Sequence, residues 1–440
     1  MKAIYWFRRD RRLADNEALS FASNYQLAPV VFTNGIEKLS PNRAHSLVQS
    51  IRSLDESLQH KLSISNAEPG DVLVGLAEHY QAQVVIATRA FDTEGMLEQA
   101  EVAEKLQENS ISLKLVGSYY AIAPGTVLKP DGTAYKVYTP FWRAWSQLSI
   151  PKPFAEPKLD LLEPFERNYP ELNTPPTIEI NAGEDAAKDT LERFAQKVSD
   201  YEDTRDLMAI SGTSKLSHAL AHGEIHPRTI IDRLAFASEV FIKEICWREF
   251  YADVMFRNPH TLNDYYDPRF AKMRYDSGEQ AEKNLRAWKE GKTGYPIVDA
   301  AMRQLSQTGW MHNRARMITA SFLIKDLHLE WQTGAEWFEH LLTDFDPSSN
   351  AHGWQWTAGC GTDASPYFRV FNPILQGKKF DPQGEYISRY VPELAHLDSR
   401  SIHEPWEAID GYSNGYVQRI VDHSAERQET LARYQELKSN

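Results

Sequence analysis

The sequence is poor in cysteine and lacks any long hydrophobic run. Its two cysteines, Cys246 and Cys360, are too few for a disulfide framework, and their spacing matches no metal-binding pattern. We therefore expect a reduced, cytoplasmic setting and no metal site. No apolar run is long enough to cross a bilayer, and residues 1–12 lack the apolar core of a signal peptide. The sequence predicts a soluble protein with no membrane partner.

An excess of positive charge is also missing. The formal net charge is −13, which argues against coating nucleic acid by bulk electrostatics but leaves room for a local basic patch. The 440 residues predict two or three domains, taking roughly 150 residues per domain. Aromatic residues, in contrast, make up 11% of the chain and include eleven Trp. They concentrate in the second half, which indicates a packed helical body or an aromatic-lined site.

The first part of the chain alternates strand-like and helical patterns. The candidate strands cover residues 3–7, 27–33, 82–88 and 111–117, and the amphipathic segments between them include 43–60 and 70–80. This alternation predicts an α/β domain with a parallel, Rossmann-like sheet. No G-x-G-x-x-G follows the first strand, so dinucleotide binding by this domain is not supported.

A proline-rich stretch follows the α/β pattern and has little periodicity, which predicts a long inter-domain connection. Beyond about residue 183 the strand patterns disappear and helical periods recur. The predicted helices cover residues 185–201, 227–236, 241–256, 297–307, 310–327 and 335–342. The sequence thus predicts an α/β domain over 1–128, a linker over 129–184 and a larger all-α domain over 185–440.

The segment GTSKLS, residues 212–217, places a glycine and hydroxyl side chains before a helix. Such a segment can hold a phosphate through its backbone N–H groups and hydroxyls. An ordinary helix N-cap is the alternative, and we favour it on this segment alone. On the helix predicted over residues 241–256, Glu244, Trp247 and Arg248 share one face. They form either a surface ion pair over an aromatic ring or one wall of a polar pocket.

The stretch TGWMHNRARMITASF, residues 308–322, predicts a helix with buried Trp310, Met311, Met317, Ile318 and Phe322, yet it also carries several polar groups. Asn313, Arg316 and Met317 share a face, and Arg314 projects elsewhere. In the simplest alternative, Met317 fills a gap in the core and Asn313 is a satisfied buried amide.

The next segment is unusually rich in polar and aromatic groups, which indicates a site rather than a requirement of the fold. They are Asp344, Asp346, Asn350, Trp354, Trp356 and Arg369. A core position is the alternative for Trp354.

Several of these motifs occur together, in order, over nearly the whole chain. GTSKLS, EICWREFY, GKTGYPIVDAAMRQL, TGWMHNRARM, NAHGWQW, PYFRVFNP and FDPQGEYISRYVPEL resemble the flavin-domain motifs of the photolyase/cryptochrome family. FRRDRRLADNEAL resembles its N-terminal signature, with Arg11 where the family usually has Leu. The resemblance implies an α/β domain joined by a long linker to an all-helical domain that binds FAD.

The resemblance also implies roles for particular residues around FAD. Asn350 would face the flavin N5 atom, and Arg316 would pair with Asp344. The implied FAD-binding residues are Tyr201, Thr213, Ser214, Lys215, Leu216, Ser217, Arg248, Asn313, Arg316, Asp344, Asp346 and Asn350. The flavin would lie against the face of Asn313 and Met317, so that the polar atoms of this face would contact a ligand instead of water.

Certain side chains distinguish the repair activities within the family, and those of this sequence match one activity. Glu244, Trp247, Asn313 and Met317 occupy the positions typical of class I cyclobutane pyrimidine dimer photolyases. Such an enzyme, a deoxyribodipyrimidine photo-lyase, would repair dimers in DNA by light-driven electron transfer from FADH⁻. Glu244, Asn313, Met317 and Asn350 would be catalytic. The implied DNA-binding residues are Arg205, Trp247, Arg314, Trp356 and Arg369. A monomer is expected.

The family's electron-transfer chain and antenna are only partly matched. Trp354 and Trp331 match the first two Trp of the chain, and Tyr275 stands near the position of the third. Slower or rerouted photoreduction is therefore expected. Glu94 matches one folate-binding position, which implies methenyltetrahydrofolate, with a deazaflavin or an empty pocket as alternatives. Two other functions remain: a cryptochrome-type photoreceptor without repair activity, and a flavin redox protein without light chemistry.

Overall fold

The computed structural model describes residues 1–366 and 369–439, and the chain forms two compact units. Unit 1 consists of Met1–Ser199, Ser214–Pro259 and Thr343–Asp346, and unit 2 of Asp200–Thr213, His260–Leu342 and Pro347–Asn440. The chain therefore passes from one unit to the other several times. The domain boundaries predicted at residues 128 and 184 stay predictions.

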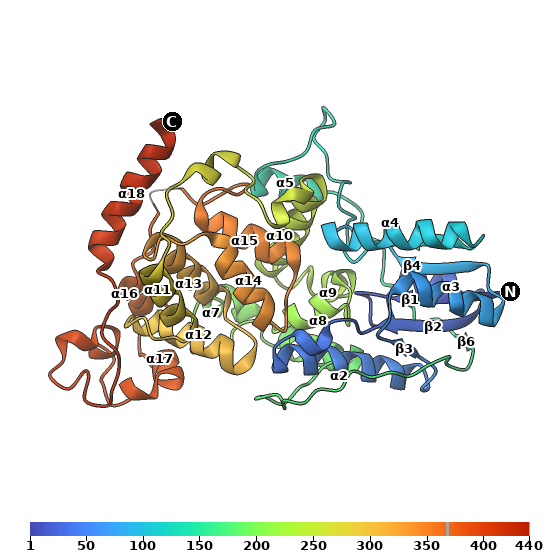
Figure 1. Cartoon of the computed structure of the whole chain (residues 1–440), viewed down its shortest axis with the longest axis horizontal. Coiled ribbons are helices and arrows are strands. Elements are labelled where there is room, and N and C mark those ends of the chain that lie inside the picture. Colours follow the sequence, from blue (N-terminus) through green and yellow to red (C-terminus); the bar gives the residue numbers. More distant parts are fainter. Residues whose placement is uncertain (367–368, 440) are drawn as a thin grey trace. The chain divides into compact units, whose positions relative to one another are not determined.

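Unit 1 is built around a parallel sheet (Figure 1). Its strands are β1 Lys2–Phe7, β2 Gln26–Phe32, β3 Ser63–Ser65, β4 Val84–Thr88, β5 Ser112–Val116 and β6 Asp160–Leu161. They lie in the order β3-β2-β1-β4-β5, β6 pairs with β2, and every pairing is parallel. The predicted α/β fold with a parallel sheet is confirmed.

The side chains of β1 show how helices come to cover both faces of the sheet. Tyr5 and Phe7 point into one buried cluster, and Ile4 and Trp6 point into another, because successive side chains of a strand alternate between faces. The first cluster is completed by α1 Glu17–Ala22 and α2 Pro41–Ser57, and the second by α3 Pro69–Tyr80 and α4 Thr93–Glu108. The continuous apolar composition of β1 follows from burial on two sides.

The proline-rich stretch is less irregular than the sequence predicts. It contains the helix α5 Tyr138–Trp145 and the strand β6. Tyr138, Phe141 and Trp145 are buried on one face of α5, which packs on α10 Glu239–Arg257. The surrounding prolines hid this short amphipathic period. The other helices of unit 1 are η1 Ile36–Lys38, α6 Glu184–Ala195, α8 Ser217–His222 and α9 Pro227–Leu234.

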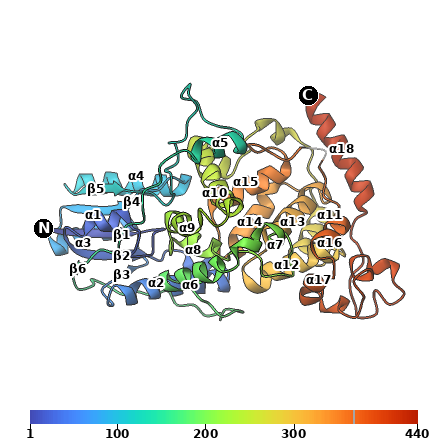
Figure 2. The ribbon, with the colours of Figure 1, turned by 180° about the vertical axis from the view of Figure 1, so that it is seen from behind.

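Unit 2 is helical, and no strand occurs among the described residues after Leu161 (Figure 2). Its α-helices are α7 Tyr201–Thr204, α11 Glu279–Lys289, α12 Pro296–Thr308, α13 Asn313–Lys325, α14 Trp331–Leu341, α15 Pro347–Ala358, α16 Pro373–Phe380, α17 Glu385–Tyr390 and α18 His423–Ser439. The short 3-10 helices in and beside it are η2 Val198–Asp200, η3 Pro259–Leu262, η4 Pro268–Lys272, η5 Pro392–Leu394, η6 Ser401–His403 and η7 Pro405–Glu407. The predicted all-helical second half is confirmed. Among the helices described, none has both the length and the apolar composition needed to cross a bilayer.

The core of unit 2 contains a cluster of aromatic rings beneath α13. Trp288 of α11 stacks on Phe338 of α14 with a centroid distance of 6.2 Å, and Trp354 of α15 meets Phe338 edge-on at 5.0 Å. The Trp288 indole N–H donates to the carbonyl of Thr319 on α13 (3.1 Å). Trp354 is therefore a core residue, whatever else it does.

The helix α13 is shorter than predicted at both ends. It begins at Asn313, where the Nδ1 atom of the cap residue His312 accepts a hydrogen bond from the Arg314 N–H (3.1 Å). Met311, Ile318 and Phe322 are buried as predicted, but Trp310 and Met317 are only half-buried. The helical period of the sequence continues N-terminal to the cap residue, and the predicted helix therefore began too early.

Candidate functional site

The predicted site residues are distributed over both units. In unit 1, Glu244, Trp247 and Arg248 lie on one half-buried face of α10. Phe241, Ile245 and Phe250 of the same helix are buried. The hydroxyl of Ser238 caps the start of this helix by accepting from the Phe241 N–H (3.2 Å). The predicted face of α10 is thus only partly covered by the protein.

Trp247 is held in place by an aromatic stack that the sequence did not predict. Its ring lies on Tyr138 of α5 with a centroid distance of 3.7 Å and an interplanar angle of 8°. The Tyr138 hydroxyl donates to the carbonyl of Lys243 on α10 (2.6 Å). A hydrogen bond and a stack therefore fix the position of both rings. The residues are 109 positions apart in the chain, so no local sequence pattern connects them.

Two predicted FAD-binding residues of unit 1, Arg248 and Asp346, lie together. An Arg248 guanidinium nitrogen is 3.8 Å from the Asp346 carboxylate, and the guanidinium lies 4.6 Å from the ring centroid of Tyr120. Arg9, which the sequence did not single out, donates to Asp346 at 2.7 Å. Burial lowers the pKa of Arg9, but the charges of Asp346 and Asp92 outweigh it and raise that pKa. Two guanidiniums therefore lie beside the Asp346 carboxylate, and that of Arg9 donates a hydrogen bond to it.

The segment before α8 does not form an ordinary N-cap. Leu216 occupies the cap position of α8, and no side-chain cap bond is present there in the described chain. The Ser214 hydroxyl instead accepts from the Leu216 N–H (3.2 Å) within a tight turn, in which Lys215 has a left-handed φ of 59°. Such a φ is unfavourable for a residue with a side chain and is found mainly where function or packing requires it.

Gly212 and Thr213, which precede this turn, belong to unit 2. A Cβ atom on Gly212 would lie 2.6 Å from the Thr204 hydroxyl oxygen and 2.7 Å from its carbonyl oxygen, so only glycine fits there. Arg205 is the C-cap residue of α7, and its guanidinium lies 5.3 Å from the ring centroid of Tyr201, which is buried. Tyr201 and Arg205, predicted for FAD and DNA respectively, are thus neighbours.

On α13 the polar face predicted from the sequence is not buried. Asn313 is exposed, and Arg316 and Met317 are half-buried, so the alternative of a satisfied buried amide does not hold. Arg316 is oriented by donating to the Met311 carbonyl (2.8 Å). Arg314 donates to Asp206 (2.8 Å), and its Nη1 atom is 3.7 Å from the Met317 sulfur. The predicted pair between Arg316 and Asp344 joins residues of different units and stays a prediction.

On α15, Asn350 is half-buried, and its amide donates to the Ala335 carbonyl (3.1 Å). His352 on the same helix is buried with its Nε2 atom 3.4 Å from the Thr261 hydroxyl. Burial lowers the pKa of His352 to about 4, so its ring is neutral at physiological pH. Trp356 is half-buried on the same helix.

Two other predicted residues are exposed. Arg369 lies beyond α15, directly after residues 367 and 368 of the PYFRVFNP motif, which fall outside the described residues. Glu94, the predicted antenna residue, lies in the first turn of α4.

The aromatic residues of unit 2 continue beyond the predicted pair Trp354 and Trp331. The Tyr265 ring meets Trp331 edge-on at 6.3 Å and stacks on Tyr275 at 6.5 Å. Trp331 and Tyr265 are buried, and Tyr275 is half-buried. Tyr265 thus connects two residues predicted for electron transfer. Sequence reasoning missed it because folding alone brings residues 265 and 331 together.

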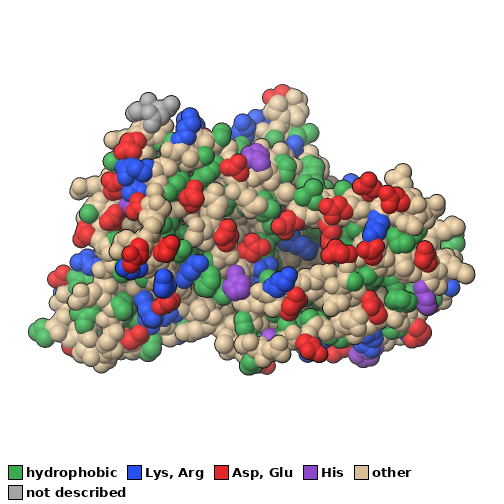
Figure 3. All heavy atoms as spheres, in the orientation of Figure 1, with side chains coloured by type: hydrophobic (Ala, Val, Ile, Leu, Met, Phe, Trp, Pro, Cys, Tyr) green, Lys and Arg blue, Asp and Glu red, His purple; other side chains and the backbone are tan. Residues whose placement is uncertain are grey.

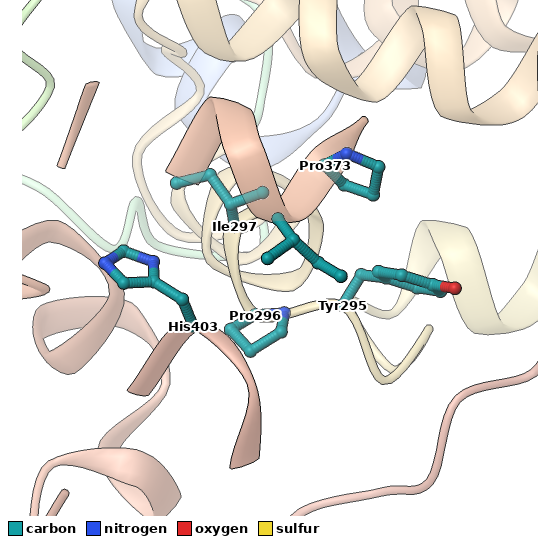
Figure 4. A pocket seen from close by; sticks show the side chains of 6 residues that line it. Tyr295, Pro296, Ile297, Pro373 and His403 are labelled. Carbon is teal, nitrogen blue, oxygen red and sulfur yellow. The ribbon is translucent and has the colours of Figure 1, made fainter. Parts of the chain in front are cut away.

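A small hollow in unit 2 contains none of the predicted site residues (Figure 4). It leaves essentially no room for even a water molecule, whereas usual ligand pockets measure roughly 300–1,000 Å³. It is lined by Tyr295, Pro296, Ile297, Pro373, Ile374 and His403. We therefore do not assign the function to this hollow.

Known proteins resemble the chain over its whole length. The family model described as DNA photolyase matches residues 3–158, and that described as FAD binding domain of DNA photolyase matches residues 241–436. The chain is 37% identical to the deoxyribodipyrimidine photo-lyase of Agrobacterium fabrum (strain C58 / ATCC 33970), covering 99% of this chain and 98% of that protein.

Solved structures give the same result. A bacterial class III photolyase from Agrobacterium tumefaciens has a TM-score of 0.89 and 35% identity, covering 100% of this chain and 98% of that one. A Synechocystis sp. PCC6803 cryptochrome has a TM-score of 0.87 and 28% identity, covering 98% of both chains. An archaeal photolyase from Sulfolobus tokodaii, described with two FAD molecules and a novel light-harvesting cofactor, has a TM-score of 0.86 and 27% identity, covering 99% of this chain and 100% of that one.

Proposed function

Because the chain belongs to the DNA photolyase family, we propose that it repairs cyclobutane pyrimidine dimers in DNA by light-driven electron transfer from reduced FAD. The observation that carries this proposal is the face of α10, on which Glu244 stands one turn from the stacked Trp247. The proposal concerns the substrate and does not assign the chain to one of the photolyase classes. The sequence predicts class I, whereas one similar structure is a class III photolyase.

The chain carries the FAD-binding domain of the family. We propose that FAD is held by the residues named for it in the sequence analysis. In unit 1, the tight turn at Ser214–Ser217 offers hydroxyls and N–H groups that suit a phosphate, and Arg248 with Asp346 offers a donor beside an acceptor. In unit 2, Asn313 and Asn350 offer amides. When bound, the reduced flavin supplies the electron on absorbing light.

The dimer is recognised, in this proposal, after it has been turned out of the duplex, which costs less for a damaged pair. Trp247 and Trp356 stack on its bases, and stacking of this kind is worth about 1–3 kcal/mol per base. Glu244 accepts from the pyrimidine N3–H and, when protonated, donates to the carbonyl that gains negative charge. Asn313 and Met317 lie between the flavin and the dimer.

Phosphates beside the lesion are contacted by Arg205, Arg314 and Arg369. Arg314 is paired with Asp206 in the structure, and both side chains are partly exposed, at 19% and 38%. An exposed pair of this kind contributes little to stability, about 0–1 kcal/mol. Arg314 therefore exchanges the carboxylate for a DNA phosphate at small cost.

The proposal is tested by illuminating the reduced, flavin-loaded protein with DNA that carries one thymine dimer. We expect Glu244→Ala to lower the number of dimers repaired per absorbed photon while leaving FAD content unchanged. The matched control is Glu239→Ala, which removes a carboxylate paired with Lys243 at the start of the same helix. Equal repair by the wild type, Glu244→Ala and Glu239→Ala would contradict the assignment of Glu244 to the site.

A cryptochrome-type photoreceptor without repair activity is the second candidate, supported by the similarity to the Synechocystis cryptochrome. The two functions differ in one measurement. A photoreceptor shows light-dependent changes of its flavin spectrum, but leaves the dimers in the DNA intact.

We further propose that a second chromophore transfers light energy to the flavin and contacts Glu94. The two FAD molecules of the Sulfolobus tokodaii photolyase support a second chromophore in this family, but not its identity. Absorbance of the gently purified protein distinguishes methenyltetrahydrofolate, a deazaflavin and an additional flavin. A cytoplasmic monomer that binds damaged DNA is the expected working state.

A further inference from the structure

Three side chains of metal-binding types converge in unit 1, directly after the segment 213–217 that is proposed for FAD. They are His218 and His222 of α8 and Glu224, which follows that helix. The Glu224 Oε1 atom lies 3.8 Å from His218 Nε2 and 3.7 Å from His222 Nδ1. All three ligand atoms lie within 4.8 Å of one another.

The local structure brings the three side chains together. His218 and His222 are four residues apart and share one face of α8, with ring centroids 4.1 Å apart. Gly223 then ends the helix with a φ of 72° and returns the chain toward this face. A Cβ atom on Gly223 would lie 1.9 Å from the Arg9 carbonyl oxygen, so the turn requires glycine.

The ligand atoms are buried, but their hydrogen-bonding capacity is unused. The side chains of His218, His222 and Glu224 are 18%, 6% and 1% exposed. His218 Nε2, His222 Nδ1 and Glu224 Oε1 have no hydrogen-bond partner within residues 1–366 and 369–439. More than about nine in ten buried polar groups have a partner. Three such atoms within 4.8 Å of one another therefore indicate a ligand.

The three donors are of types that bind transition-metal ions, namely imidazole nitrogens and a carboxylate oxygen. Two histidines and one glutamate form a known zinc ligand set. Tetrahedral zinc with bonds of 2.0–2.2 Å spaces its ligand atoms by about 3.4 Å, so shifts of a few tenths of an ångström would bring the two measured pairs into range.

Arg11 offers a competing explanation for Glu224. Its guanidinium is buried nearby, where burial lowers its pKa to about 10 and the charge of Glu224 partly offsets that effect. Glu224 could thus serve only as the counter-ion of Arg11. However, the Arg11 Nε and Nη1 atoms also lack hydrogen-bond partners in the described part of the chain, so no closed ion pair satisfies either group.

We propose that His218, His222 and Glu224 bind one divalent transition-metal ion of the zinc class, with water as the fourth ligand. The ion ties α8 to the turn that follows it. This site is independent of the proposed function, because it shares no residue with the flavin or DNA sites. Sequence analysis missed it because the H-x₃-H-x-E spacing becomes significant only when the helix, turn and burial are known.

The test uses the full chain with its flavin bound, stripped of metal by a chelator and titrated with Zn²⁺. We expect the wild type to retain one more zinc ion per chain than His222→Ala or Glu224→Gln. Affinity should fall by more than roughly 100-fold, since losing even an outer partner of a ligand costs 10–100-fold. The exposed His79 provides the matched control, and His79→Gln should bind zinc like the wild type. Co²⁺ should give the intense visible absorption of a tetrahedral site only when all three ligands are present.

If Glu224→Gln does not fold, His218→Ala at the more exposed edge of the cluster takes its place. Arg11→Leu, which restores the residue usual in the family signature, should bind zinc more tightly because it removes a nearby positive charge. Unchanged zinc affinity in a folded Arg11→Leu variant would place the ion elsewhere and overturn the assignment. Equal zinc retention by the wild type and His222→Ala would do the same and leave Glu224 as the counter-ion of Arg11.

Discussion

At the scale of single residues, the chemistry of the predicted site depends on neighbours that the sequence does not reveal. The spacing of Glu244 and Trp247 on one helical face follows from the sequence, because helical geometry is local. The stack of Trp247 on Tyr138 does not, because it joins α10 to a helix within a proline-rich stretch. Arg9, which fixes the Asp346 carboxylate, was missed for the same reason.

The stack makes a prediction about binding of damaged DNA in the dark. Trp247→Ala should weaken binding by about 1–3 kcal/mol, roughly 5- to 150-fold, since one stacking surface is lost. Tyr138→Leu should weaken binding less, because Trp247 stays but loses its support. Fluorescence anisotropy with dimer-bearing and intact DNA measures both effects. Trp142→Ala, also on α5, is the control. If Trp142→Ala weakened binding as much as Trp247→Ala, that result would contradict a specific stack.

At the scale of secondary-structure elements, α10 is anchored by a buried carboxylate. Glu249 accepts from the N–H groups of Ala121 (2.5 Å) and Ile122 (3.1 Å) and from the Trp145 indole (2.7 Å). Burial raises the pKa of Glu249 to about 7, although these hydrogen bonds favour the charged form. The start of this helix was predicted to within two residues. The partners of Glu249 were not predicted, because they lie in distant parts of the chain.

Glu249 predicts a specific dependence of stability on pH. Its pKa is higher in the folded chain, about 7, than the ordinary value of 4.5, so its contribution is present below pH 4.5 and is lost as pH rises through 7. The shift corresponds to roughly 3 kcal/mol. The wild type should therefore lose free energy of unfolding between pH 5 and pH 8, and Glu249→Gln should lose less by about that amount. Urea unfolding at both pH values measures this difference, and an unchanged pH dependence would contradict the raised pKa.

The aromatic residues around α14 make a second prediction at this scale. Trp331, Tyr265 and Tyr275 form a continuous path, and the Tyr265 hydroxyl donates to the Glu330 carboxylate (3.0 Å). If electrons reach the flavin along this path, Tyr265→Phe should slow its photoreduction by an external donor, because Phe is far harder to oxidise. Tyr412→Phe is the control. A long-lived surface Trp radical in transient absorption would contradict the path.

At the scale of the whole molecule, the sequence predicted the two kinds of structure but not how the chain is divided between compact units. The parallel sheet follows from short apolar runs and the helical second half from a period of 3.6 residues, and both signals are local. The assignment of residues 343–346 to unit 1 and of residues 200–213 to unit 2 depends on long-range contacts and has no local signal. The helix α5 and the strand β6 were missed because prolines surround short elements.

The charge of the whole chain also bears on DNA binding. The net charge is −13, and acidic and basic side chains are interspersed on the face shown in Figure 3. If Arg205, Arg314 and Arg369 supply three phosphate contacts, the logarithm of affinity should fall with the logarithm of salt with a slope of about −2.7. This corresponds to roughly 40-fold weaker binding between 50 and 200 mM salt. Arg369→Gln should flatten the slope by about 0.9, whereas the exposed control Arg193→Gln should leave it unchanged.

The central claim is that light drives this chain to restore intact pyrimidines. The most direct measurement compares an illuminated and a dark sample of the reduced, flavin-loaded protein with an oligonucleotide carrying one thymine dimer, and quantifies the thymines by chromatography. We predict that adjacent thymines reappear only in the illuminated sample and repeatedly per protein molecule. Protein that holds its flavin and absorbs light, yet leaves every dimer in place, would contradict the claim.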